Sequence, residues 1–361
     1  MPRRCPQGQC SFRPAILVIA VVLLGAPLVA PPGVRAEEPD PPATISATRP
    51  PSFRPGSEQP LENPFVLRLM DDPGLAEEVL ARGKLVRPPG RPAVKALVRK
   101  KPTEPSVMFR LGVQLPPHPP VEVFFKPRQR GYRDWATETA VCRLARHLRV
   151  RIAPCHERVV PRKALEAALP RVPEQLRENL LWEEGPEGPS LYGFFRVWAP
   201  AYVDRLGTHR ATRQNLLALA SFLAPARREE VRRSALLQEI ADVFVLDFLV
   251  YNNDRRRNLG SVRHAPDGVR LFAIDFGDGL SASPRKKRLC KALLAELGLF
   301  RRTLVERIRH LTEEQLVTLW HRPNRGWLVE REHVAIVLAQ KRRLLEHVAR
   351  RERQHGAQIY F

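Results

Sequence analysis

The stretches DVFVLDFLVYNNDRRRNLGSV (residues 242–262) and VRLFAIDFGDGL (residues 269–280) decide the fold of this chain. The first opens as an apolar run, typical of a buried helix, and continues into a polar loop that carries Asp254 and Asn258. The second follows a short turn and is typical of a strand that ends on Asp275. The order is therefore an acid on a loop, an amide close behind it, and a second acid after a strand.

Kinases place their chemistry in this order. Catalysis of phosphoryl transfer consists mostly of positioning and charge neutralisation, so two acids and an amide beside a divalent metal ion are sufficient. Either motif alone is a weak signal. The ordered pair indicates phosphoryl transfer.

A lysine on a predicted strand and a glutamate on a predicted helix form the next group. Val121–Pro127 is rich in β-forming residues and contains Lys126, and Ser106–Val113 is the expected hairpin partner. A helix is predicted over Ala136–Leu148, and Glu138 falls on or beside its apolar face. That face consists of Val141, Leu144, Ala145 and Leu148.

A carboxylate that faces inward needs a partner, and Lys126 is the natural one for Glu138. In kinases this pairing orients the lysine onto the nucleotide phosphates. The alternative is that Glu138 is an ordinary first-turn glutamate favoured by the helix dipole, with Lys126 a surface lysine at the end of a strand. The motifs around Asp254 and Asp275, which follow in kinase order, favour the pair.

Two runs of the sequence resemble the secretory-pathway kinases that include the Golgi casein kinase, the glycosaminoglycan xylosylkinase and Four-jointed. The run FFKPRQRGYRDWATETAVCRLARHLRVRIAPCHERVV (residues 124–160) is similar to the Phe-Lys-Pro strand and Glu-bearing helix of that family. Residues 242–258 resemble its catalytic segment, and AIDFGDGL resembles its metal segment in spacing. The likeness covers roughly Phe109–Leu280, and HipA-type and phosphoinositide kinases share the layout more distantly.

The resemblance implies a role for each matching residue. Lys126 would contact the α- and β-phosphates of ATP, and Glu138 would hold Lys126 or help bind the metal. Asp254 would act as the catalytic acid/base or orient the acceptor hydroxyl. Asp275 would bind Mn²⁺ or Mg²⁺, with Asn258 as a candidate second ligand.

The resemblance implies two further roles. Arg255 would support the catalytic loop structurally. The strand LYGFFRVW (residues 191–198) falls where the linker between the lobes is expected, which gives an adenine-facing backbone near Arg196 to Trp198. An apolar strand is also typical of plain core.

The sequence departs from the family at four points. Arg256 stands where many relatives have His, and Phe276 stands where the secretory family favours Asn. Asn258 follows Asp254 by four positions rather than five, which bears on its metal role. No G-x-G-x-x-G loop precedes Lys126, so the phosphates would be covered differently from those in ordinary protein kinases.

The N-terminus has the pattern of a targeting segment. Residues 1–36 combine a basic start, an apolar run over Ala15–Ala30, and small or modest residues at Val34 and Ala36 that suit a cleavage site. We therefore predict a signal peptide and an exported protein, with an uncleaved anchor that tethers it to the membrane as the alternative. Residues 37–64 are rich in Pro and Ser, as in a disordered linker.

Composition bounds the remaining possibilities. The 361 residues carry a net charge of +22, which favours anionic partners without choosing among nucleotides, acidic proteins, phosphorylated sugars, lipid headgroups and nucleic acid. RNA-recognition and zinc-finger motifs are missing from the sequence, so nucleic acid is not the expected partner. Three cysteines follow the signal: Cys142, Cys155 and Cys290. They allow at most one disulfide within a monomer and demand none.

The sequence thus predicts an α+β, two-lobed kinase-like fold over residues 65–361. The small β-rich N-lobe spans about 65–195 and the mainly helical C-lobe about 196–361. Residues 65–85 suggest a short helix at the start of the N-lobe. In the C-lobe, residues 312–315 have the pattern of a capping box that opens a helix, and residues 327–351 that of a long final amphipathic helix. The expected function is metal-assisted transfer of the γ-phosphate of ATP to a hydroxyl of a protein or glycan. The alternatives are a pseudoenzyme of the same fold that binds nucleotide or a protein partner without turnover, and a module that binds anionic polymers through its charge.

Overall fold

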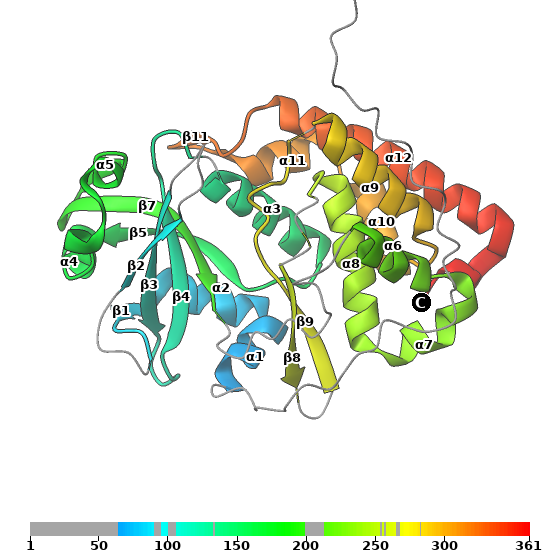
Figure 1. Ribbon diagram of the computed structural model, residues 1–361, viewed down its shortest axis with the longest axis horizontal. Coiled ribbons are helices and arrows are strands. Elements are labelled where there is room, and N and C mark those ends of the chain that lie inside the picture. Colours follow the sequence, from blue (N-terminus) through cyan, green and yellow to red (C-terminus); the bar gives the residue numbers. More distant parts are fainter. Residues whose placement is uncertain are drawn as a thin grey trace, which may run out of the picture. The chain divides into compact units, whose positions relative to one another are not determined.

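Two lobes are visible in a computed structural model of the chain (Figure 1). The structure describes residues 64–89, 95–99, 106–132, 134–198, 213–252, 255, 258–264, 268–281 and 283–361. All of these fall within one compact unit that spans Ile45–Phe361. The predicted signal peptide and nearly all of the predicted linker lie outside the described residues.

The first lobe is built on an antiparallel sheet of seven strands. The strands run in the order β1-β3-β4-β7-β5, with β2 also paired to β3 and β6 also paired to β7. Their bounds are β1 (Lys84–Val86), β2 (Lys95–Arg99), β3 (Ser106–Gln114), β4 (Val121–Pro127), β5 (Cys155–Pro161), β6 (Trp182–Gly185) and β7 (Gly188–Val197). The predicted strand that contains Lys126 and its hairpin partner are therefore confirmed as β4 and β3.

Helices cover both faces of this sheet. One face packs on α1 (Pro64–Asp71) and α2 (Pro73–Arg82) through Phe109, Phe125 and Phe195. A single helix was expected here. Two form because Asp72 accepts a hydrogen bond from Leu75 N and Pro73 opens the second helix.

The long helix α3 (Asp134–Leu148) lies on the other face of the sheet, next to the second lobe (Figure 1). Its four predicted core residues are all buried, which confirms the apolar face read from the sequence. Two short helices, α4 (Arg162–Leu165) and α5 (Glu174–Arg177), lie beside the far end of the sheet (Figure 1).

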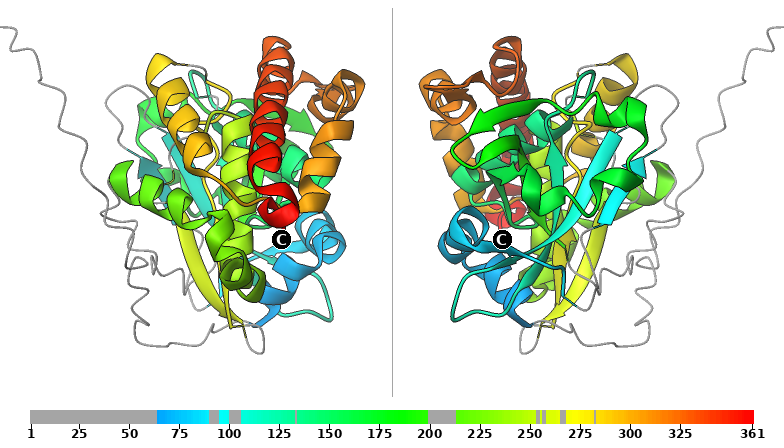
Figure 2. Two further views of the ribbon diagram at one scale, coloured as in Figure 1. Left: turned by 90° about the vertical axis from the view of Figure 1, so that its right-hand side faces the viewer. Right: turned by 90° about the vertical axis from the view of Figure 1, so that its left-hand side faces the viewer.

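The second lobe is helical, and α8 (Ala235–Leu249) lies at its centre. Nearly every residue of α8 is buried, because apolar residues occur on all its sides, and the acids Glu239, Asp242 and Asp247 are buried among them. Around it lie α6 (Arg213–Phe222), α7 (Arg228–Arg233), α9 (Pro284–Glu296), α10 (Arg302–His310), α11 (Glu313–Trp320) and α12 (Glu332–His355), as the two side views show (Figure 2). Within the described part of the chain, no helix is both long enough and apolar enough to cross a membrane.

Two hairpins complete the second lobe. The pair β8 (Leu259–His264) and β9 (Gly268–Ala273) follows α8. The strand predicted before Asp275 is β9, whereas β8 begins where the sequence indicated a polar loop. The pair β10 (His321–Arg322) and β11 (Gly326–Trp327) follows α11, which opens with the predicted capping box at Thr312. The final helix was expected from Trp327 but begins at Glu332, because Trp327 belongs to this second hairpin.

Trp320 fastens the second lobe to α3. Its side chain is fully buried, and its Nε1–H donates to the carbonyl oxygen of Ala140 at 2.9 Å. Arg143, on the same helix, donates to the carbonyl oxygen of Leu319 at 2.8 Å. The end of α11 therefore holds α3 from the side opposite the sheet.

We expect Trp320→Phe to destabilise the fold by about 2 kcal/mol, since it removes a buried hydrogen bond and leaves a small void. The half-buried Trp327 offers a matched control, and Trp327→Phe should cost about 0.5 kcal/mol or less. Urea denaturation of the two variants and the parent measures the difference. Equal losses would show that the contact with α3 contributes nothing particular.

Candidate active site

Lys126 joins the two lobes through its ammonium group. It lies on β4 with its side chain buried, and its Nζ contacts Oε1 of Glu138 on α3. The same Nζ lies 3.3 Å from Oδ1 of Asp275, which follows β9 in the second lobe. The predicted pair of Lys126 with Glu138 is confirmed, and Asp275 adds a second carboxylate to it.

The charged side chains in this group shift one another's pKa values. Burial alone lowers the pKa of Lys126, but the carboxylates of Asp275 and Glu138 outweigh it and raise the pKa above its ordinary value. Lys126 is therefore charged at neutral pH. Burial raises the pKa of Glu138 to about 7, against the lowering by Lys126 and Arg196.

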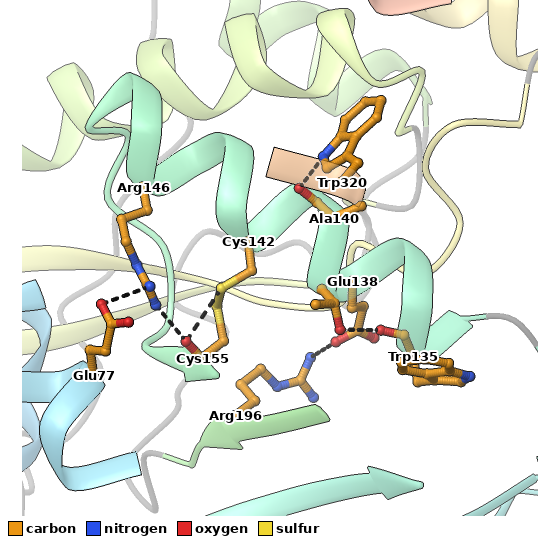
Figure 3. The surroundings of a disulfide bond; sticks show 10 residues. Glu77, Trp135, Glu138, Ala140, Cys142, Arg146, Cys155, Arg196 and Trp320 are labelled. Carbon is orange, nitrogen blue, oxygen red and sulfur yellow. Dashed lines mark hydrogen bonds and ion pairs between the residues drawn. A yellow bond between two sulfur atoms is a disulfide. The ribbon is translucent and has the colours of Figure 1, made fainter. Parts of the chain in front are cut away.

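Arg196 brings a second cation to Glu138. Its Nη1 lies 3.3 Å from Oε2 of Glu138, and its side chain is buried (Figure 3). Alternate residues of a strand share a face, so Arg196 lies on the same side of β7 as Tyr192 and Phe194. The sequence analysis predicted that the backbone of Arg196, rather than its side chain, would face the nucleotide. The structure shows its guanidinium among the charged groups.

The second part of the site, Asn258 and Asp275, lies at the open end of the β8–β9 hairpin. Ile274 N donates to the carbonyl oxygen of Asn258 at 3.0 Å, which places Asn258 beside the residue that precedes Asp275. Asn258 is buried, whereas the Asp275 side chain is 18% exposed and so open to a ligand. Asp275 has a φ of +57°, in the left-handed region, where Asp is one of the better-tolerated residues.

Arg255 contacts this end of the hairpin and stabilises it. Its side chain is 1% exposed, and it donates to both carboxylate oxygens of Asp247, at 2.6 and 2.8 Å. It also donates to the carbonyl oxygen of Ile274 at 2.6 Å and lies 4.0 Å from the ring centre of Phe276. The structural role predicted for Arg255 is therefore present, since it ties α8 to the segment that carries Asp275.

Trp198 lies just past the end of β7. Its backbone N–H donates to the carbonyl oxygen of Glu122 at 2.8 Å, and its ring packs edge-on against Phe124 with centroids 4.8 Å apart. Phe124 precedes Lys126 by two residues, so both side chains leave the same face of β4. An aromatic surface therefore lies next to the lysine.

Asp254, the predicted catalytic residue, lies outside the described residues. Its neighbour Arg255 is described, and so is Asp275 with its contacts. Across the described part of the chain, no three or more His, Cys, Asp or Glu residues group closely enough to hold a metal ion by themselves. A metal site would therefore combine Asp275 with Glu138, Asn258, Asp254 or ligand oxygens.

Three features of the candidate site were not predicted from the sequence. Asp247 was read as part of an apolar helix, although an acid in so apolar a run signals a buried partner. The guanidinium of Arg196 was missed because the strand was judged by its backbone. The sequence allows the disulfide between Cys142 and Cys155 but does not select it, because spacing alone does not determine a pairing.

Comparison with known proteins bears on the fold. No family model matches the sequence, and no curated protein matches it. Hydra Fam20, solved with sugar, is similar at 14% identity and a TM-score of 0.52, over 78% of this chain and 90% of its own. The chain has a Fam20-like kinase fold. This confirms the predicted two-lobed architecture and, at the level of the fold, the resemblance to secretory kinases.

Two structures of the Golgi casein kinase are also similar. One has 14% identity and a TM-score of 0.49, over 73% of this chain and 74% of its own. The other, with Mn and ADP bound, has 15% identity and the same TM-score and coverage.

We expect Asp247→Asn to destabilise the protein by about 3–5 kcal/mol, because it leaves the guanidinium of Arg255 buried without a counter-charge. The exposed pair of Arg227 and Glu230 offers a control, and Glu230→Gln should cost about 0.5 kcal/mol or less. Chemical denaturation of both variants tests this. A loss below about 1 kcal/mol for Asp247→Asn would mean that the charge of Asp247 is not needed to hold Arg255.

Proposed function

We propose that this protein is an ATP-dependent kinase that transfers the γ-phosphate to a hydroxyl of a protein or glycan, with Mn²⁺ or Mg²⁺. One observation carries the proposal: the buried ammonium of Lys126 touches both the helix carboxylate Glu138 and the hairpin carboxylate Asp275. These are the groups that kinases use to hold phosphates and metal between two lobes.

The donor set fits a hard divalent cation. Asp275 and Glu138 offer carboxylate oxygens, and Asn258 lies at the same end of the hairpin as Asp275. Oxygen ligands of this kind suit Mg²⁺ and Mn²⁺. When bound, such an ion would neutralise the charge of the transferred phosphoryl group.

The cations fit the phosphates. The Nε of Arg196 is buried and has no hydrogen-bond partner among the described residues. A buried unpaired donor is costly, and a phosphate oxygen would satisfy it. We assign the α- and β-phosphates to Lys126 and Arg196, with the adenine against the aromatic surface of Phe124 and Trp198.

The reaction needs one more group, and we assign it to Asp254. An acceptor hydroxyl oxygen would form a bond to the γ-phosphorus while the bond from that phosphorus to the β–γ bridging oxygen breaks. ADP leaves with the electrons of that bond, and the hydroxyl proton passes to the carboxylate of Asp254. Lys126 and Arg196 would hold the remaining phosphates in place during the transfer.

The proposed setting is outside the cytosol. The basic start and apolar run of residues 1–36 support export, with a membrane-tethered form as the alternative. The disulfide between Cys142 and Cys155 fits an oxidising compartment.

A second candidate is a pseudoenzyme of the same fold that binds nucleotide or a protein partner without turnover. It is favoured by the spacing of Asn258 from Asp254 and by residues 100–105, which join β2 to β3 and contain no glycine. Incubation of purified protein with γ-labelled ATP, Mn²⁺ or Mg²⁺, and mixed protein and glycan acceptors separates the candidates. Labelled acceptor supports the kinase, and undetectable transfer to every acceptor supports the pseudoenzyme.

Asp275→Ala should abolish metal-dependent nucleotide binding and leave the fold intact, because it removes the partly exposed carboxylate that faces Lys126. A thermal-shift assay with ATP and Mn²⁺ measures this. Asp72→Ala is the control: it removes the cap of α2 and lowers stability by about 1 kcal/mol, yet it should keep the full ATP–Mn²⁺ shift. A parental shift in Asp275→Ala would exclude Asp275 as the metal ligand.

Asp254→Asn should keep nucleotide affinity and cut turnover by about 10²–10⁴-fold, the usual scale of general acid–base catalysis. If Asp254 only caps its loop or pairs with a neighbouring arginine, the variant should instead lose roughly 0.5–2 kcal/mol of stability with little change in turnover. Initial rate and melting temperature, measured on one preparation, distinguish these results. The control is Asp72→Asn, in which the new side chain still caps α2 and turnover should stay parental.

A further inference from the structure

The disulfide between Cys142 and Cys155 lies next to the candidate active site (Figure 3). Cys142 is on α3, four residues after Glu138, so both side chains leave the same face of the helix. Cys155 begins β5 and is the register partner of Arg196 on β7. The covalent link and the ion pair between Arg196 and Glu138 are therefore adjacent connections between the same helix and the same sheet.

A third connection lies one turn further along α3. Arg146 follows Cys142 by four residues, and its Nη2 donates to the carbonyl oxygen of Cys155 at 2.9 Å. Its Nη1 lies 2.9 Å from a carboxylate oxygen of Glu77 on α2. Glu138, Cys142 and Arg146 thus form one stripe that fastens α3 to the sheet, and the disulfide is its central member.

Both cysteines are buried, and two cavities border the disulfide. Both cysteines line a cavity of about 510 Å³ that is bordered by the α1–α2 segment. Both also line a cavity of about 410 Å³ that is bordered by Thr318 and Leu319 near the end of α11. Arg146 lines both cavities and places a cation near the sulfur atoms. A cation at such a place favours the thiolate form of cysteine.

We propose that this disulfide is a site of thiol–disulfide exchange that controls the position of Glu138. In the oxidised protein, the link fixes the middle of α3 against β5 and keeps Glu138 within reach of Lys126. Reduction by a small dithiol releases the middle of α3 from the sheet, and the competent arrangement of Glu138 becomes less populated. The consequence for nucleotide binding rests on the proposed function, whereas the motion of α3 does not.

The exchange balances as two successive displacements. A thiolate of the dithiol attacks one sulfur of the bridge, a mixed disulfide forms, and the other cysteine leaves as a thiolate. The second thiolate of the reagent then attacks the reagent's own sulfur in the mixed disulfide, which closes the reagent into a cyclic disulfide and releases the remaining cysteine as a thiolate. The reagent loses two electrons and two protons, and Cys142 and Cys155 gain them as two thiols.

The test uses the full chain with Cys5, Cys10 and Cys290 replaced by Ala, so that dithiothreitol can act on one bridge alone. We expect dithiothreitol to free two thiols, counted by mass after alkylation, without unfolding the protein. Amides of α3 around Glu138 should then exchange about tenfold faster. The Kd for ATP with Mn²⁺ should rise about tenfold, as expected if the competent state falls to about a tenth of the molecules. Oxidised dithiothreitol should restore both values.

The matched control adds Cys142→Ala and Cys155→Ala to the same background. It should show the exchange and affinity of the reduced protein and should not respond to dithiothreitol. If the triple Ala background fails to fold, the same alkylation and exchange measurements are made on the parent chain. The exchange of α3 is again compared before and after two thiols appear at Cys142 and Cys155.

Two results would overturn the proposal. One is a bridge that resists dithiothreitol until the whole protein unfolds. The other is a reduced protein that keeps the parental exchange of α3, which would make the disulfide a structural link only. If neither form binds ATP, the proposed function fails, and the exchange of α3 still decides the role of the disulfide.

Discussion

A buried ammonium group needs carboxylates around it, and this requirement connects the two lobes. Taking a charge out of water costs several kcal/mol unless it is paired and hydrogen-bonded. The ion pairs of Lys126 with Glu138 on α3 and with Asp275 beyond β9 offset this cost. Because the two acids belong to different lobes, Lys126 can be charged and buried only when the lobes are folded against each other. The candidate site is thus also part of the contact between them.

The helix α3 carries this arrangement, and it is held from both sides. On the sheet side it is bound through Glu138, the disulfide of Cys142 and the guanidinium of Arg146. On the other side, the indole of Trp320 donates to the carbonyl oxygen of Ala140. Kinase helices of this kind often move to switch activity. Here the fold places a covalent link at the position where such a helix would have to move.

Sequence reasoning found what local pattern encodes and missed what depends on the meeting of distant segments. Periodicity placed Glu138 on a helix and Lys126 on a strand, and the order of motifs then suggested their contact. No periodicity pairs Asp247 with Arg255, because the partner comes from a loop whose path is set by tertiary structure. For Trp327, the local pattern led to a wrong prediction. Its neighbours have helical composition, but Trp327 pairs with His321 in the short β10–β11 hairpin. The pairing of Cys142 with Cys155 likewise follows from where β5 lies, not from their spacing.

The charge balance of the site indicates how a ligand would act on it. Glu138 forms ion pairs with two cations, Lys126 and Arg196. Both are charged donors of the kind that bind phosphate. Lys126 is shared with Asp275, whereas the Nε of Arg196 lacks a partner among the described residues. A phosphate would therefore gain a donor at Arg196 without breaking the contact between Lys126 and Glu138. Because the carboxylates of Glu138 and Asp275 already neutralise the two cations, a bound phosphate would bring excess negative charge, and a divalent metal ion beside Asp275 would offset it.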